Sequence, residues 1–220
     1  MKNKWELTIA LPKGRLLDEA LVLLKKIGIN AIVPSGSSRE LIFFSDDGRI
    51  RFIILRAVDV PTYVEYGAAD MGIAGKDILV EQGRDVYEPV DLKTGFCRLI
   101  VAEPVKLKEK DNPLKWTNIR IATKYPNITE RYFGSRGVQV EIIKLYGSIE
   151  LAPIVSLSER IVDLVSTGET LRANGLTEVE EIMPSTARLI VNRASLKLKM
   201  EAIGDLITKL KKVLRAGGAV

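Results

Sequence analysis

An acid inside an apolar run, followed by a turn rich in small and hydroxyl-bearing residues, is the part of this sequence best suited to chemistry. Asp163 interrupts a β-branched run that begins at Arg160, and a helical pattern resumes shortly after it. The residues between are Ser166, Thr167, Gly168, Glu169 and Thr170. This order predicts a strand, a tight turn and the start of a helix. Such a turn directs backbone N–H groups and hydroxyls at one point, with the positive end of a helix dipole behind them.

The turn therefore suits a phosphate, and the acid on the strand is placed for the hydroxyls of a ribose. Together they predict a site for a phosphorylated sugar. A structural interpretation competes with this one and is more common in general: Thr167 caps the helix, and Glu169 is an acid of its first turn.

Cations at turns form a second group of candidates. Lys13 and Arg15 follow an apolar run at residues 5–11 and precede leucines at helical spacing that end near Gly28. Ligands of open α/β sheets bind at the carboxyl ends of strands, and the start of a helix disfavours cations unless an anion is present. An anionic ligand and two solvated loop cations are equally good explanations.

The residue inventory limits the chemistry. The 220-residue chain contains one cysteine, Cys97, and no histidine, so an internal disulfide framework and the usual neutral-pH base are excluded. Hydrophobic residues make up 46% and charged residues 28%, which is typical of a globular protein. Catalysis would have to rely on carboxylates, cations and positioning.

The net charge of +5 arises to a large extent in a cationic run near the C-terminus. This run lacks interleaved aromatic residues, so it indicates the solvated face of a helix rather than a nucleic-acid site. The sequence shows neither a signal-peptide core nor an apolar stretch long enough to span a membrane. We expect a cytoplasmic protein that binds neither nucleic acid nor membrane.

Strand patterns alternate with helical patterns along the chain, which predicts an α/β fold with largely parallel sheets. A hairpin is expected around the Asp47-Gly48 turn, and one long amphipathic helix from Asn192 almost to the end. The halves suggest two lobes, with the chain crossing between them twice: residues 1–94 plus 184–220, and residues 95–183. A cleft would then have Lys13, Arg15 and Arg39 on one wall and residues 163–170 on the other.

Six strings in a fixed order resemble one family, the short-form ATP phosphoribosyltransferases that begin histidine biosynthesis. They are ALPKGRLLDEA (10–20), SRELIF (38–43), LRAVDVPTYVEYGAADMGIAGKD (55–77), RIATKYPNITERYF (120–133), IIKLYGSIELAP (142–153) and RIVDLVSTGETLRANGL (160–176). The resemblance implies two lobes similar to the type II periplasmic-binding-protein fold. It also implies transfer of a phosphoribosyl group from phosphoribosyl pyrophosphate to N1 of ATP, with release of pyrophosphate.

The resemblance assigns roles to residues. Asp163 resembles the acid that binds the ribose hydroxyls, and residues 166–170 resemble the loop that holds the 5-phosphate. Arg15 and Arg39 are similar to arginines that act on phosphates at the reacting centre. Further residues assigned to ATP or the cleft are Lys13, Arg56, Asp70 and Glu150. The lobe with the cations would be the ATP side, and the other lobe the phosphoribosyl pyrophosphate side.

Further expectations concern cofactor and partners. The resemblance implies Mg²⁺, carried by the substrate phosphates rather than by a protein metal site. It also implies a regulatory subunit similar to histidyl-tRNA synthetase, in a hetero-oligomer expected to be a hetero-octamer, because no residues follow Val220 to form a histidine-binding domain. The alternative function is a non-catalytic, two-lobed protein that binds a small ligand. One position departs from the family pattern, since Ser156 stands where glycine is expected.

Overall fold

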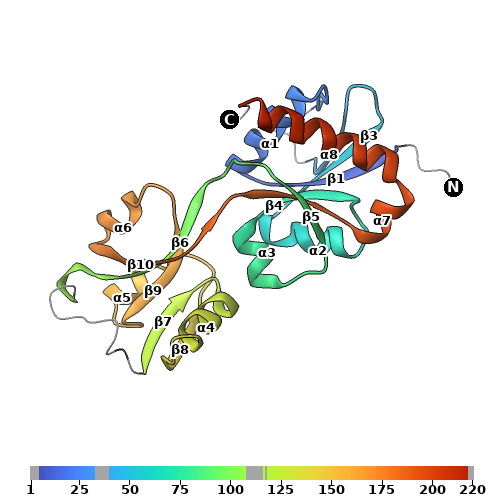
Figure 1. Ribbon diagram of the computed structural model, residues 1–220. Helices are drawn as coiled ribbons and strands as arrows, with labels where there is room; N and C mark the ends of the chain where they lie inside the picture. Colours follow the sequence, from blue (N-terminus) through green and yellow to red (C-terminus); the bar gives the residue numbers. More distant parts are fainter. Residues whose placement is uncertain (1–4, 33–39, 108–115, 117, 218–220) are drawn as a thin grey trace. The chain divides into compact units, whose positions relative to one another are not determined.

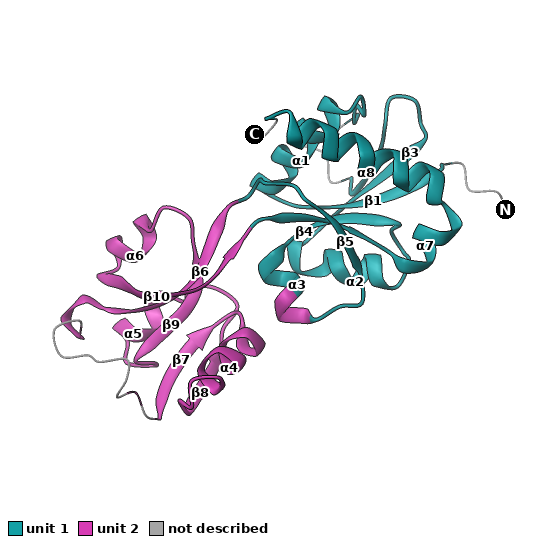
Figure 2. Ribbon diagram, viewed as in Figure 1, with its two compact units in different colours: residues 1–79, 83–95, 186–220 teal, residues 80–82, 96–185 magenta. Residues whose placement is uncertain are grey.

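The computed structural model describes residues 5–32, 40–107, 116 and 118–217 (Figure 1). The chain forms two compact units (Figure 2). Unit 1 comprises residues 1–79, 83–95 and 186–220, and unit 2 comprises residues 80–82 and 96–185. The divisions at 95/96 and 185/186 lie one and two residues from the expected ones. The sequence did not indicate that residues 80–82 would group with the second unit.

Unit 1 is built on a six-stranded sheet with the order β2-β3-β1-β4-β11-β5. Its strands are β1 (Leu7–Pro12), β2 (Ile42–Phe44), β3 (Ile50–Leu55), β4 (Met71–Gly75), β5 (Tyr87–Asp91) and β11 (Ala187–Val191). Its helices are α1 (Arg15–Lys26), a 3₁₀ turn at Ala57–Asp59, α2 (Val60–Glu65), α7 (Arg193–Leu198) and α8 (Met200–Arg215). Helix α3 (Lys76–Gln82) starts in unit 1.

The two faces of this sheet are covered by different helices. Alternate residues of β1 point to opposite faces, so Ile9 and Leu11 join the core that includes α1 and α8, while Ala10 joins the core that includes α2. Every residue of β1 is buried as a result. At Gly72 a Cβ atom would lie 2.8 Å from the Val60 side chain, so only glycine lets α2 pack this closely on β4.

Unit 2 is built on a five-stranded sheet with the order β10-β6-β9-β7-β8. Its strands are β6 (Cys97–Pro104), β7 (Ile119–Thr123), β8 (Val140–Lys144), β9 (Arg160–Val165) and β10 (Leu176–Ser185). Its helices are a 3₁₀ turn at Val105–Leu107, α4 (Pro126–Gly134), α5 (Leu151–Ile154) and α6 (Glu169–Ala173). Neighbouring residues of β9 again serve opposite faces, since Val162 packs in one core cluster and Ile161 in the other.

Both sheets are mixed, so the expectation of largely parallel sheets is wrong. Strand β1 is parallel to β3 and β4, and β7 is parallel to β8 and β9. Strand β11 is antiparallel to β4 and β5, and β6 is antiparallel to β9 and β10. Strands β6 and β11, the first strand after each crossing between the units, run opposite to their neighbours, and β2 is antiparallel to β3.

The C-terminal segment forms two helices instead of the single one predicted. The helical backbone breaks at Lys199, which has φ −127° and ψ 36°. The Lys199 ammonium lies 2.8 Å from the Asp70 carboxylate, and Ser195 of α7 donates a hydrogen bond to the same carboxylate. The apolar spacing continues across the break, so periodicity could not reveal it. Strand β5, where the apolar pattern is weak, was also not predicted.

Candidate active site

The turn between β1 and α1 presents cations at the carboxyl edge of the unit 1 sheet. The Lys13 amide donates to the Leu55 carbonyl at 2.8 Å, which fixes the turn against the end of β3. Gly14 has φ 90°, a value that favours glycine, and Arg15 then opens α1. The side chains of Lys13 and Arg15 are exposed. The backbone of this turn thus places two exposed cations at the edge where α/β sheets bind ligands.

Arg56 lies beside this turn because β1 and β3 are parallel and in register. Pro12 pairs with Leu55, so the residues that follow them, Lys13 and Arg56, are neighbours at the sheet edge. Neither side chain makes an ion pair within the part of the chain that the structure describes. Arg15 contacts Glu19, with 3.3 Å between Nε and Oε1. Lys13, Arg15 and Arg56 therefore form an exposed, largely uncompensated cationic edge.

Asp70 does not join these cations. It precedes β4, and its carboxylate accepts hydrogen bonds from the Thr8 amide, the Ser195 hydroxyl and the Lys199 ammonium at 2.7–2.8 Å. Thr8 is near the amino end of β1, at the sheet edge opposite to Lys13. The structure therefore gives Asp70 a buried, structural place that ties α7 and Lys199 to the sheet. Arg39, the other cation expected beside Arg15, lies outside the described residues.

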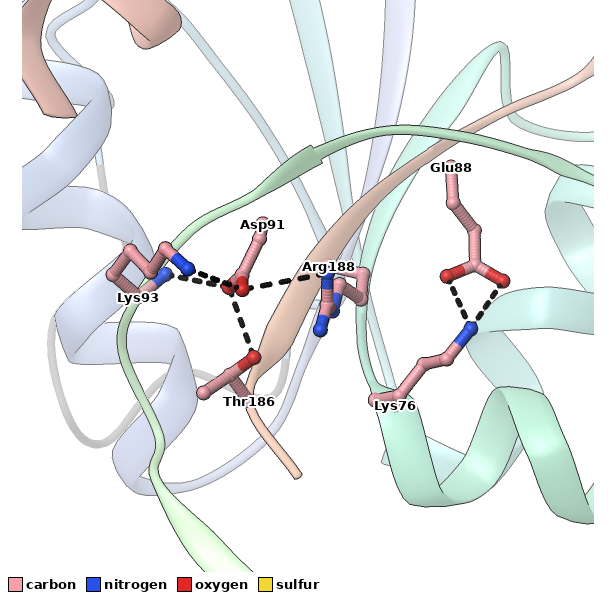
Figure 3. A network of polar contacts seen from close by, with 6 residues as sticks. All are labelled: Lys76, Glu88, Asp91, Lys93, Thr186 and Arg188. Atoms are coloured by element: carbon pink, nitrogen blue, oxygen red, sulfur yellow. Dashed lines mark hydrogen bonds and ion pairs between the residues drawn. The ribbon is translucent and has the colours of Figure 1, made fainter. Parts of the chain in front are cut away.

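Further cations lie along the same edge, and sequence reasoning missed them (Figure 3). Lys76, which opens α3, contacts Glu88 at 2.8 Å. Asp91 accepts hydrogen bonds from the amide and ammonium of Lys93 and from the Thr186 hydroxyl, and it forms an ion pair with Arg188. Burial acts to raise the pKa of Asp91, but the bonds from Lys93 and Thr186 outweigh it and lower the pKa. These acids neutralise their cations, which distinguishes them from the cationic edge.

In unit 2 the expected strand, turn and helix are present at the predicted residues. Strand β9 ends at Val165, Gly168 has φ 75°, and α6 begins at Glu169. The Thr167 hydroxyl accepts a hydrogen bond from the Glu169 amide at a long 3.4 Å, and Gly168 occupies the N-cap position itself. The capping interpretation thus explains only part of the turn's geometry. Residues 163–171 also line a cavity.

This cavity has a volume of about 140 Å³ and lies within unit 2. Its lining contains every candidate residue that the sequence indicated in this unit. The lining residues are Glu150, Asp163, Leu164, Val165, Ser166, Thr167, Gly168, Glu169, Thr170 and Leu171. Glu150 is distant in sequence and reaches the cavity because α5 packs beside β9. Two acids therefore face a loop of hydroxyls and backbone N–H groups.

Asp163 is the most unusual of these residues electrostatically. Its relative exposure is 9%, and its carboxylate accepts a hydrogen bond from the Leu164 amide at 2.9 Å. Burial raises the pKa of Asp163, the nearby charge of Glu150 raises it further, and the Leu164 amide and the charge of Lys124 act in the opposite direction. Keeping a carboxylate buried beside a second acid costs stability, which points to a role in binding rather than in folding.

Lys124 is a cation of this site that sequence reasoning missed. It directly follows β7, whose residue Thr123 pairs with Val162 of β9, so the parallel register brings it beside Asp163. Its side chain is exposed. No local signal in the sequence indicated that β7 and β9 would be neighbours.

Ser156, which departs from the family pattern, adopts the backbone that glycine would adopt. Its φ is 58°, in the left-handed region, and the following Leu157 amide donates to the Ala152 carbonyl at 2.9 Å. The chain therefore turns as tightly after α5 as a glycine would permit. The serine carries the backbone strain of that conformation.

The comparisons with known proteins decide the family. Residues 56–212 match the family described as HisG, ATP phosphoribosyltransferase. The chain is 65% identical over 206 residues to ATP phosphoribosyltransferase 2 of Geobacter sulfurreducens. The aligned residues cover 94% of this chain and 97% of the relative. The chain belongs to the ATP phosphoribosyltransferase family. Its reaction is the transfer of a phosphoribosyl group to ATP, the first step of histidine biosynthesis.

Solved structures agree with this assignment. An ATP phosphoribosyl transferase (HisG:HisZ) complex from Thermotoga maritima matches with a TM-score of 0.80 and 37% identity, covering 96% of this chain and 99% of that chain. The substrate binding protein of an amino acid ABC transporter matches with a TM-score of 0.59 and 13% identity, over 97% and 95% of the two chains. The second likeness shows the fold alone, and it confirms the expected type II periplasmic-binding-protein arrangement.

Two absences are of note. None of the helices in the described residues is long and apolar enough to cross a membrane. ATP phosphoribosyltransferases need a metal ion, but the described residues contain no cluster of three or more acidic, cysteine or histidine side chains that could hold one.

Proposed function

We propose that the cavity of unit 2 binds phosphoribosyl pyrophosphate and that the cationic edge of unit 1 acts on the phosphates of ATP and of the departing pyrophosphate. The cavity carries this proposal, because it joins two carboxylates to a loop of hydroxyls and backbone N–H groups within about 140 Å³. The loop of Ser166, Thr167, Gly168, Glu169 and Thr170 would hold the 5-phosphate. Asp163 would accept hydrogen bonds from the ribose hydroxyls, and Glu150 would lie on the same side of the sugar.

The residue inventory suits this chemistry. Breaking the bond between ribose C1 and pyrophosphate builds positive charge on the sugar and negative charge on the leaving group. Cations positioned on the leaving group stabilise that charge without a proton transfer. Adenine N1 attacks through its own lone pair, so the absence of histidine is no obstacle. We assign the leaving-group role to Arg15 and Arg39, and less specific phosphate contacts to Lys13 and Arg56.

Mg²⁺ fits this site as a cation carried by the substrate. Magnesium in phosphate-transferring sites is held by one or two carboxylates and by substrate phosphates rather than by an all-protein cage. Asp163 and Glu150 face one cavity and supply such carboxylates. When bound, the ion would neutralise pyrophosphate charge, and the acids would orient it.

The partner is proposed from the Thermotoga maritima HisG:HisZ complex, whose HisG chain is covered almost entirely by this one. We propose that this chain assembles with a HisZ-type regulatory subunit resembling histidyl-tRNA synthetase, in a hetero-octamer. Since ATP is the substrate, a cytoplasmic location belongs to the same proposal. Histidine should then inhibit the assembled enzyme, and titration of histidine into the isolated chain should show no saturable binding. Saturable micromolar binding by the chain alone would contradict the two-subunit regulation.

The catalytic proposal is tested by mixing the chain with ATP, phosphoribosyl pyrophosphate and Mg²⁺, with pyrophosphatase added to drive the reaction forward. The assay is run with and without the HisZ-type subunit of the same source. Product absorbance should rise only when both substrates are present. Saturable substrate binding without turnover in either format would favour the non-catalytic alternative.

A further inference from the structure

One acid beside the cationic edge has no role in the reaction described above. Glu19 lies one helical turn after Arg15 on α1, and its Oε1 is 3.3 Å from Arg15 Nε. The Arg15 side chain is 67% exposed and that of Glu19 is 21% exposed. Glu19 is thus the more buried member of the pair and Arg15 the exposed one.

This pair is poorly placed to stabilise the helix. A cation in the first turn opposes the helix dipole, and a basic residue four positions before an acid is the less favourable order for such pairs. Asp205 and Lys209 on α8 show the favourable order, with the acid first and 2.7 Å between the charged atoms. Helix stability therefore does not explain why Glu19 faces Arg15.

The second carboxylate oxygen of Glu19 is not explained by helix stability either. Oε2 is buried, and it has no hydrogen-bond partner among the described residues. A Cβ atom built on Gly95 would lie 3.8 Å from this oxygen and 3.2 Å from Leu16 Cδ1. Gly95, with φ 63°, belongs to unit 1 and leaves room for the Glu19 carboxylate beside α1. The carboxylate is held by packing, and its other oxygen forms the ion pair with Arg15.

We propose that Glu19 is a positioning residue for Arg15. Its charge, 3.3 Å from Nε, holds the guanidinium beside α1 and leaves the two terminal nitrogens free to meet the oxygens of a departing pyrophosphate. A guanidinium fixed in advance loses less freedom when the charge develops, which favours the transition state over the bound substrate. The proposal rests on the role given to Arg15 above.

The test compares Glu19→Gln and Glu19→Leu with a matched control, Asp205→Asn, which removes the acid of an exposed pair at the same spacing on α8. We expect the Glu19 variants to lower kcat about tenfold while KM for both substrates changes less than about twofold. The melting temperature should not fall, since a partly exposed pair in the unfavourable order stabilises little. The control should retain wild-type kcat.

A double-mutant cycle with Arg15→Ala separates the outcomes. In the Arg15→Ala background, changing Glu19 should have no further effect on kcat, because the group that it positions is gone. An equal loss in both backgrounds, or wild-type kcat in both Glu19 variants, would overturn the positioning role while leaving the phosphoribosyl transfer intact.

A readout without turnover tests the same contact. The Arg15 Nε–H signal in a ¹⁵N NMR spectrum, identified by its loss in Arg15→Ala, should exchange slowly in the wild-type chain and rapidly in Glu19→Gln. Equal exchange rates would overturn the proposal. Failure of the wild-type chain in the transfer assay would instead refute the proposed function, and the exchange rates would still decide whether Glu19 orders Arg15.

Discussion

Replacing Asp163 by Asn tests the sugar-phosphate site in two ways, because it should weaken the binding of phosphoribosyl pyrophosphate without lowering the stability of the fold. The substitution keeps the size of the side chain and an oxygen that can accept from the Leu164 amide, which now donates at 2.9 Å. It removes the charge that would accept hydrogen bonds from ribose hydroxyls. A hydrogen bond to a charged group is worth about 1.5–3 kcal/mol, so phosphoribosyl pyrophosphate should bind roughly 10- to 150-fold more weakly.

The fold should respond in the other direction. The pKa of Asp163 is raised in the folded state, chiefly by burial. A carboxyl with a raised pKa holds its proton more tightly when folded, so its stabilising contribution is full below the unfolded pKa near 3.9 and is lost as pH rises through the folded pKa. At neutral pH the ionised Asp163 therefore destabilises the fold, and Asn relieves that cost. The variant should melt at the same or a higher temperature than wild type.

Two measurements decide the matter. Isothermal titration calorimetry with phosphoribosyl pyrophosphate and Mg²⁺ gives the affinity, and scanning calorimetry at several pH values gives the stability. The gain in stability of Asp163→Asn over wild type should shrink as pH falls toward the unfolded pKa. Wild-type affinity in the variant, or a clear fall in melting temperature at neutral pH, would refute the reasoning and make Asp163 a structural residue.

Three further predictions concern the other sites. Arg15→Ala and Arg39→Ala should each lower kcat by roughly 10²-fold or more with smaller changes in KM, as steady-state kinetics would show, whereas a change in KM alone would mean ground-state phosphate binding. Asp70→Asn should cost about 1–3 kcal/mol of unfolding free energy in denaturant titrations and leave KM unchanged, because the carboxylate is bonded only to structural partners among the described residues; a rise in KM without a loss of stability would return it to the substrate site. Ser156→Gly should raise stability by about 0.5–1 kcal/mol, since relief of a left-handed backbone, about 1–2 kcal/mol, exceeds the added unfolded-state entropy of glycine. An unchanged or lower melting temperature would show that the serine side chain contributes there.

The sequence was most informative where one strand and the turn after it form a site by themselves. The β9 strand, its turn and the start of α6 were predicted at the right residues, because the apolar run, the small residues and the helical spacing are all local signals. The turn after β1 was predicted for the same reason. The polar groups of each turn are close together in the sequence, so their grouping follows from local signals.

Sites that depend on distant partners were not predictable in this way. The family resemblance assigned Asp70 to ATP or the cleft, but its partners Ser195 and Lys199 lie 125 and 129 residues away. Lys124 was overlooked because its place beside Asp163 depends on the pairing of β7 with β9. Propensity and periodicity describe one segment at a time, so they carry no information on which strands become neighbours.

The distribution of charge shows how the fold prepares two different sites from ordinary α/β turns. In unit 1 the in-register parallel pairing of β1 and β3 places Lys13 beside Arg56 at a sheet edge, where both side chains are exposed. In unit 2 the acid lies within strand β9 itself, so burial raises its pKa and the unit loses stability to keep it there. The exposed Lys13 and Arg56 therefore suit the less specific phosphate contacts proposed above, and the buried acid suits the proposed contact with the ribose, which must remain in place during the transfer.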